Sequence, residues 1–460
     1  MENEGYSSGE QDSGASDSSR VDFSGFPDTG TSNGSSFDEG DRPESWGDRL
    51  QQLAKFFLTL GVVGFGGPAA HMAAMHDWAV AREGWLTEEE LLEGVAVCEM
   101  LPGPASTQLG IYIGYQRGGA IGALVAGICF MAPAFAMVIA LSWAYFEFQG
   151  LPQLTALLGG VSPVVVAVVA AFAWKLMKKC LVRKSGGFEV VAIALAVSSA
   201  LAVGVVNLPV LPVLAIAGAV GIVAYGPHRS GKSGTAGFLP WFFGTELAIL
   251  ATQSDAVVGL TAAGFWGGDR FFEYAGPLFT VFFRAGTAIF GGGLSIVPLL
   301  ETDVVQQWGW LTRTEFLNGV AIGQMTPGPV VLAVAFMGYK VAGVFGALWA
   351  TVSAFTPSFG FIILLAPLLQ RSRKNRWVKA FLKGVTPGVL GTIAAVTVPL
   401  AIAALGLEGG LAAVSWGFTA VAATLMGAAA IALIKFKVAA WKLLLAGALV
   451  GLITGSLSLT

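Results

Sequence analysis

The chain has 460 residues, of which 55% are hydrophobic and only 12% are charged. A soluble globular domain carries about 25% charged residues, so the composition excludes an ordinary soluble protein and predicts a membrane protein. The net charge of −3 points to no particular partner, and no nucleic-acid partner is expected. The three cysteines form no CxxC motif, so we expect no disulfide framework, no metal site and no cofactor.

The start of the chain, residues 1–47, differs in composition from the rest. Residues 1–45 contain eleven Asp or Glu against two Arg, with many Ser and Gly. A segment of this kind cannot bury a core and is predicted to be a disordered acidic tail.

Long apolar runs follow the tail. They lie at 118–147, 154–177, 187–207, 342–370, 412–434 and 438–458. Each can cross a hydrocarbon core about 30 Å thick, which needs about 20 helical residues. A β-barrel would instead alternate over segments of about 10 residues. The predicted fold class is all-α, a polytopic helical membrane protein in contact with the lipid bilayer.

Helix breaks occur early in the apolar region. A helix from about residue 50 is predicted to end at the glycines of FGGP, 65–68, and another to begin at Pro68. In WLTEEELLEG, Thr87 and Glu90 fit a capping box, so a helix begins at residue 88. It ends by Leu101 and is about 20 Å long, too short to cross the bilayer.

The motif PGP, at residues 102–104, ends that short helix. Gly103 is expected to cap a second helix with Pro104 at its first position, where proline is favoured. The broken elements are either re-entrant hairpins or bent spans. We favour hairpins, because His71, His76 and Asp77 make 68–80 a poor membrane crossing.

The same pattern recurs in the second half of the chain. Residues 65–104 and 290–329 share 17 identities in 40 positions at an offset of 225. One residue then drops out, and at offset 224 Pro133 meets Pro357. We therefore divide the chain beyond the tail into three parts. These are a first transporter repeat at 48–226, a basic loop with a linking transmembrane helix at 227–273, and a second transporter repeat at 274–460.

The two repeats are predicted to have opposite orientations. Basic clusters lie at 175–184, after the helix that carries Pro163, and at 371–379, before the matching helix that carries Pro387. Since lysine and arginine favour the cytoplasmic side, these helices run in opposite directions. The linking helix, at 241–263, supplies the odd crossing. An inverted-topology repeat of this kind is a transporter architecture.

The breaks place helix N-termini at membrane depth, where free N–H groups and the helix dipole can bind an anion. Arg284 lies in an apolar stretch, and charges inside a membrane are costly and usually functional. Its first-half counterpart is Thr59, so this charge is not part of the repeat. The candidate substrate-binding residues are Gly66, Gly67, His71, Gly103, Ser106, Thr107, Gln108, Arg284, Gly291, Gly292, Ser295, Gln324, Thr326 and Gly328.

Several of these features also have structural interpretations. Arg284 has the alternative of an ion pair with Glu301 or Asp303. His71 stays open between a ligand contact, proton handling and a satisfied polar contact. Close helix packing, rather than ligand binding, is expected of Gly119, Gly122, Gly343 and Gly346. Glu90 and Glu315 are expected to act as helix caps.

Taken together, FGGPAAH at 65–71, WLTEEE at 85–90, LPGP at 101–104 and their second-half copies resemble the chromate ion transporter family in its long, two-half form. The resemblance covers residues 48–460. It implies a multi-pass protein of a bacterial inner (plasma) membrane, associated with chromate efflux, and a relation to the similar anion sulfate. One departure is Gly293 where the first half has Pro68, so the halves are not equivalent.

The expected function is therefore chromate efflux by alternating access at a midplane site built from the helix N-termini at the FGG and PGP breaks. A sulfate or other oxyanion carrier, or a channel, is the alternative. An enzyme is not expected, since the sequence has no HExxH motif and its three histidines are scattered. Protons are a possible coupling ion. The sequence leaves open the transport direction, the stoichiometry and the oligomeric state.

Overall fold

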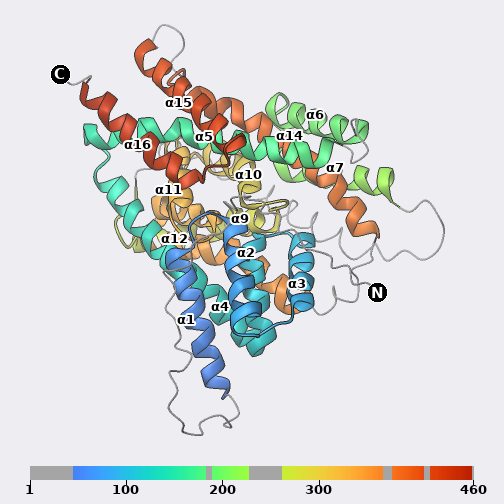
Figure 1. Ribbon diagram of the computed structural model, residues 1–460. Helices are drawn as coiled ribbons and strands as arrows, with labels where there is room; N and C mark the ends of the chain where they lie inside the picture. The colour runs from blue at the N-terminus through green and yellow to red at the C-terminus, as the bar shows by residue number, and fades with distance from the viewer. Residues whose placement is uncertain (1–44, 183–188, 227–261, 366–375, 409–414, 458–460) are drawn as a thin grey trace, which may run out of the picture. The chain divides into compact units, whose positions relative to one another are not determined.

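The computed structural model describes residues 45–182, 189–226, 262–365, 376–408 and 415–457. Within these ranges the chain forms helices and no strand (Figure 1). Most of the expected acidic tail, nearly all of the linking helix expected at 241–263, and parts of both basic clusters lie outside the described residues.

The helices of the first repeat are α1 (Trp46–Val63), α2 (Pro68–His76), α3 (Glu88–Met100), α4 (Ala105–Glu147), α5 (Pro152–Leu181), α6 (Val190–Gly204) and α7 (Val210–Tyr225). Those of the second repeat are α9 (Gly268–Thr287), α10 (Val297–Leu300), α11 (Arg313–Met325), α12 (Ala333–Gly360), α14 (Arg376–Ala404), α15 (Trp416–Ile434) and α16 (Ala440–Leu457). Matching π-helical segments, Asp77–Arg82 and Glu301–Gln307, precede α3 and α11.

The helix starts agree with the sequence signals in both repeats. The capping boxes that begin α3 and α11 are confirmed: the N–H of Glu90 donates to Thr87 Oγ1 at 3.2 Å, and that of Glu315 to Thr312 Oγ1 at 3.1 Å. α2 begins at Pro68 as predicted. Two boundaries differ. α1 already begins at Trp46, because Ser45 caps it, and Pro104 rather than Gly103 occupies the cap position of α4.

The missing residue of the second repeat lies just after its PGP motif. A 3₁₀ turn, Val330–Leu332, precedes α12, whereas α4 is α-helical from its first residue, Ala105. A 3₁₀ turn rises about 2 Å per residue against 1.5 Å in an α-helix, so it spans a similar length with fewer residues. Both repeats can therefore present the same helix despite the deletion.

The long helices α4 and α12 fold back on themselves. Their turns lie at Gly119 and Gly343, which have left-handed φ values of 62° and 55°. A side chain on Gly122 or Gly346 would overlap the carbonyl group of Gly114 or Gly338 on the preceding arm. The packing role expected of Gly122 and Gly346 is thus confirmed. Gly119 is instead a turn residue with open space beside it, because its conformation is one that glycine adopts readily. Gly343 makes the same turn and also packs closely, since a side-chain carbon there would lie 2.5 Å from the carbonyl oxygen of Gly264.

Each repeat also packs against the last helices of the other repeat. α5 contacts α15 and α16, while its counterpart α14 contacts α6 and α7 (Figure 1). The close approaches are made by glycines, Gly160 against Gly451 and Gly384 against Gly221. The exchange is mutual, as expected of two repeats related by a pseudo-two-fold axis.

Five of the described helical segments are long and apolar enough to cross a membrane: Ala105–Glu147, Pro152–Leu181, Val330–Leu364, Arg376–Ala404 and Trp416–Ile434. They differ in how far the protein encloses them. In the most apolar window, 83% of the residues are buried for Val330–Leu364 but 11% for Trp416–Ile434. The segment that contains α12 therefore belongs to the interior, whereas α15 leaves most of its apolar surface for lipid.

Candidate functional site

Each PGP motif is the tip of a helix hairpin. Gly94 of α3 packs on the ring of Tyr112 in the first arm of α4, and Gly319 of α11 packs on Phe336 of α12 in the same way. Contacts at equal or nearly equal distances in sequence before and after each motif mean that the two arms run antiparallel. This is the hairpin arrangement favoured from the sequence. The tip glycines Gly103 and Gly328 have φ values of 139° and 99°, which side-chain-bearing residues rarely adopt.

Each FGG motif is the tip of a second pair of arms. In the first repeat Phe56 of α1 stacks on Trp78 of the π-helical segment, with ring centroids 4.9 Å apart. In the second repeat Arg284 of α9 forms an ion pair with Asp303 of the matching π-helical segment. The turn at each tip depends on two glycines with positive φ, Gly66 and Gly67 in one repeat and Gly291 and Gly292 in the other.

The tips of one repeat bond to the tips of the other. The N–H of Gly103, at the first PGP, donates to the carbonyl of Ile289 at 2.8 Å. The N–H of Gly328, at the second PGP, donates to the carbonyl of Gly64 at 3.3 Å. Gly103 and Gly328 are 225 positions apart, and so are Gly64 and Ile289. The two hydrogen bonds therefore correspond to each other in the two repeats. The predicted FGG and PGP breaks therefore meet in two symmetry-related pairs.

The first PGP tip is followed by three buried polar side chains, those of Ser106, Thr107 and Gln108. The side-chain amide of Gln108 donates to the carbonyl of Pro102 at 2.7 Å. Thr107 Oγ1 and Gln108 Oε1 are buried and have no hydrogen-bond partner among the described residues. Buried polar groups are nearly always paired, so these atoms have capacity for a ligand.

The second PGP tip is surrounded by fewer polar groups. Thr326 Oγ1 donates to the carbonyl of Gly323 at 3.3 Å, while Gln324 Nε2 is buried and has no partner among the described residues. The residues that follow the tip, Val330 to Ala333, are all apolar. The structure thus brings Gln324, Thr326 and Gly328 together but gives this tip a mainly apolar environment.

The candidates at the FGG tips are less enclosed. Gly66 and Gly291 are exposed, and Gly67 and Gly292 are half-buried. Ser295 is buried, but its hydroxyl donates to the carbonyl of Gly292 at 2.7 Å and closes the local turn.

His71 is the buried polar side chain nearest to the first FGG tip. Its Nε2 lies 2.6 Å from the carbonyl oxygen of Gly64, the same oxygen that accepts from Gly328. The imidazole edge rests on Phe130, and Nδ1 has no partner among the described residues. His71 therefore braces the joint between the repeats, while one ring nitrogen keeps hydrogen-bonding capacity.

Arg284 is buried in the last turn of α9, with 5% of its side chain exposed, and its partner Asp303 has 1% exposed. This is the ion-pair arrangement given above as the alternative to an anion ligand. The neighbouring acid Glu301 pairs instead with Arg313, at 3.3 Å.

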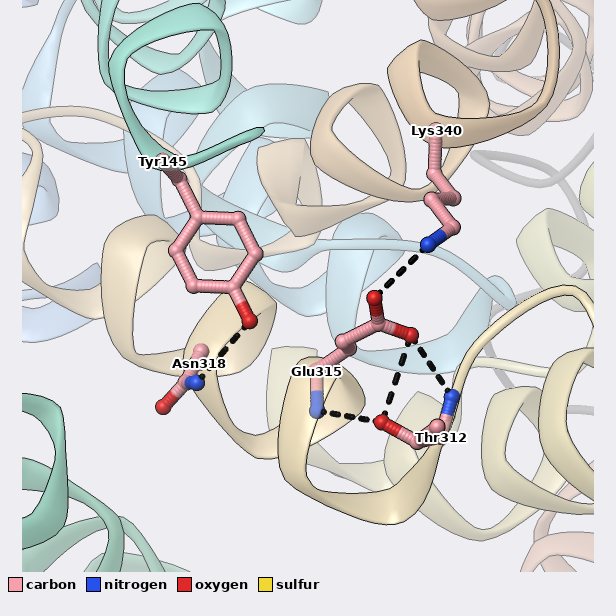
Figure 2. A network of polar contacts seen from close by, with 5 residues as sticks. All are labelled: Tyr145, Thr312, Glu315, Asn318 and Lys340. Carbon is pink, nitrogen blue, oxygen red and sulfur yellow. Dashed lines mark hydrogen bonds and ion pairs between the residues drawn. The ribbon is translucent and has the colours of Figure 1, made fainter. Parts of the chain in front are cut away.

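A second buried polar network lies at α11, and the sequence analysis did not identify it (Figure 2). Lys340 Nζ is 2.7 Å from Glu315 Oε1, so Glu315 both caps α11 and neutralises a lysine. One turn along, Asn318 donates to Tyr145 of α4 and accepts from Ser162 of α5. The sequence feature that could have identified this network is Lys340, which is a single charge within the apolar run VVLAVAFMGYKVAG at 330–343.

Comparison with known proteins gives a family for this arrangement. The family model described as Chromate transporter matches residues 51–222 and 276–452, one match in each repeat. The chain is 34% identical over 365 residues to the Chromate transport protein of Cupriavidus metallidurans, covering 76% of this chain and 82% of that one. It is 33% identical over 352 residues to the Probable chromate transport protein of Synechococcus elongatus, covering 76% and 84%.

A shorter relative is similar to part of the chain. The Uncharacterized transporter YwrA of Bacillus subtilis is 30% identical over 175 residues, which cover 38% of this chain and 93% of the relative. No solved structure matches the chain. The family matches fall on both repeats, and the PGP and FGG tips that carry the site lie within them. The chain belongs to the chromate transporter family.

Proposed function

We propose that the protein exports chromate across a bacterial inner membrane by alternating access. The substrate site lies near the bilayer midplane, where the FGG tip of each repeat meets the PGP tip of the other. The two chromate transport proteins compared above support the choice of substrate.

The observation that carries the proposal is hydrogen-bonding capacity buried at the joined tips. Thr107 Oγ1, Gln108 Oε1, Gln324 Nε2 and His71 Nδ1 are all buried and unsatisfied among the described residues. They lie on elements whose tips bond across the repeats at Gly103 and Gly328. Of these atoms, Thr107 Oγ1 and Gln324 Nε2 can donate to an oxyanion, whereas Gln108 Oε1 accepts and His71 Nδ1 donates only when the imidazole is protonated. A packed core would leave few such donors unpaired, whereas an oxyanion site needs them.

The depth of the tips fits the same proposal. α3 begins at an acidic first turn, Glu88–Glu90, which suits the membrane interface. Its 13 residues reach about 20 Å inward at 1.5 Å per residue, which brings the PGP tip close to the middle of a core about 30 Å thick.

The chemistry of the tips suits a tetrahedral oxyanion. The N-terminus of α4 has no side-chain cap, so its first N–H groups and the positive end of its dipole are available to negative oxygens. Hydroxyl and amide groups add neutral donors. Among the described residues, the buried cations Arg284 and Lys340 already pair with Asp303 and Glu315, so the positive potential for the oxyanion comes from the helix N-termini.

The test is chromate flux in membrane vesicles of defined orientation. Inside-out vesicles containing the protein should accumulate chromate, vesicles without it should not, and excess sulfate should compete only weakly. Repeating the measurement with a pH gradient of each sign tests proton coupling. Accumulation only in right-side-out vesicles would overturn the direction, and preferential flux of sulfate would favour the alternative, a sulfate or other oxyanion carrier. Unsaturable flux would favour a channel.

A further inference from the structure

The two PGP tips are equivalent in backbone but not in chemistry. Ser106, Thr107 and Gln108 follow the first tip, whereas the corresponding stretch after the second is apolar. The difference extends to the residue that each tip meets in the other repeat. That residue is Ser358 of α12 at the first tip and its repeat counterpart Ala134 of α4 at the second.

Ser358 faces the first tip directly. A side-chain carbon built on Gly103 would lie 2.7 Å from Ser358 Oγ, and it would also overlap the amide of Gln108. At the second tip, the same construction on Gly328 places the carbon 3.0 Å from the methyl group of Ala134. Because residue 103 is glycine, the side chains of Gln108 from the first repeat and Ser358 from the second can both face the first PGP tip.

The Ser358 hydroxyl is unusual for a serine in a helix. Thr351, Ser353 and Thr356 on the same helix each donate to the carbonyl four residues earlier, at 2.8, 2.7 and 2.7 Å. Ser358 is completely buried, and its Oγ has no hydrogen-bond partner among the described residues. A hydroxyl that leaves the usual local bond unmade and faces the tip is available to a ligand.

Apart from the amide oxygen of Gln108, which only accepts, the remaining groups at this point are donors. The amide nitrogen of Gln108 carries two hydrogens, and one of them is used by the carbonyl of Pro102. The first N–H bond of α4 runs from Gln108 to the carbonyl of Pro104, so the N–H groups of Ala105 to Thr107 precede it, and no side chain caps them. A tetrahedral anion presents four oxygens to such a set.

We propose that the oxyanion binds at the first PGP tip only, that Ser358 contacts it from the second repeat, and that the second tip is an apolar joint. This inference rests on the proposed function, and it assigns to Ser358 a specificity-determining hydrogen bond to a substrate oxygen. Because the hydroxyl comes from α12 and Gln108 from α4, both repeats take part in one site.

The test compares Ser358→Ala with Ser353→Ala in reconstituted vesicles. Ser353 is an equally buried serine of α12, but its hydroxyl is already satisfied by Trp349. Ser358→Ala should raise the KM for chromate roughly ten- to a hundredfold, the range for a lost hydrogen bond to a charged group. Ser353→Ala should leave the KM within about twofold of wild type.

A stability measurement separates this role from a structural one. Because the hydroxyl has no hydrogen-bond partner in the part of the chain that the structure describes, Ser358→Ala should unfold at the wild-type temperature or slightly above it. It should, however, lose the stabilisation that added chromate gives to wild type. The double variant Ser358→Ala/Ala134→Ser introduces a hydroxyl at the second tip and should not restore the wild-type KM.

Each contrary result has a distinct meaning. Wild-type transport with an unchanged KM in Ser358→Ala would overturn this inference and leave the proposed function standing. Recovery by Ala134→Ser would show that the two tips are interchangeable and would overturn the one-tip site. Absence of any oxyanion flux through wild-type protein would overturn both proposals.

Discussion

The buried pair of Arg284 and Asp303 can be tested by removing one charge and then both. Both side chains are at least 95% buried, so Arg284→Ala leaves a carboxylate without its cation in a region that water does not reach. Breaking a buried pair in this way costs about 3–5 kcal/mol. Arg284→Ala/Asp303→Asn removes the charge as well and should recover most of that loss.

The first repeat supplies a matched control. Arg82 and Asp77 form an ion pair at 3.0 Å on an arm of the first FGG hairpin, but their side chains are 41% and 40% exposed. An exposed pair contributes about 0–1 kcal/mol, so Arg82→Ala should hardly change stability. Thermal unfolding in detergent measures all three variants. An Arg284→Ala protein as stable as wild type, or a double variant no more stable than the single one, would refute the structural pair and return Arg284 to the role of anion ligand.

Three further predictions concern the first FGG tip, the buried lysine and the topology. Gly67 has a φ of 77° with open space beside it, so Gly67→Val should strain the turn by about 1–3 kcal/mol and abolish transport with normal membrane insertion. Normal chromate flux through Gly67→Val would mean that this turn serves only for packing. The control is Gly276→Ala, at a position with open space within α9, which should leave transport unchanged. Lys340→Met should lower the free energy of unfolding by up to about 3 kcal/mol, because the carboxylate of Glu315, which is only 14% exposed, loses its cation. Lys340→Met/Glu315→Gln should restore the stability, and a single variant as stable as wild type would contradict the role of the pair. Single cysteines at 175–186 and 371–379, in a chain without native cysteines, should react only from the cytoplasmic side, and labelling of either from outside would contradict the inverted orientation.

The local features of the fold could be predicted from the sequence because their causes are local. A capping box joins residues three positions apart, so Thr87 with Glu90 and Thr312 with Glu315 were sufficient to locate the starts of α3 and α11. Proline and glycine limit the backbone wherever they occur, and the FGG and PGP breaks lie where they were expected. The internal repeat could also be predicted, because it is found by aligning the two halves of the sequence and requires no knowledge of spatial contacts.

The contacts between repeats could not be predicted, since they join residues far apart in the chain. Nothing near Gly103 in sequence identifies Ile289 as the acceptor of its N–H. Within the second repeat, Asp303 was one of two acids considered as partners of Arg284, and only the structure shows that the FGG hairpin brings these two residues together across 19 positions. Ser358 was missed for a different reason: a serine within an apolar helix normally bonds to its own backbone, and only the structure shows that this one does not. Gly119 was assigned to packing because its left-handed turn has the same glycine signature as a close helix contact.

The departures from symmetry bear on how the proposed site is held in place. The two repeats differ in their buried charges. In the second repeat, the charge of Arg284 is neutralised by Asp303, and that of Lys340 by Glu315. Neutral groups without a hydrogen-bond partner among the described residues lie in both repeats, Thr107 and Gln108 in the first and Gln324 and Ser358 in the second. An unsatisfied buried group destabilises the fold unless a ligand pairs with it, so such groups are best tolerated beside elements that other interactions already hold in place. The bond from Gly103 to Ile289 provides that support, because it fixes the polar first tip against the tip of the hairpin that the Arg284–Asp303 pair closes.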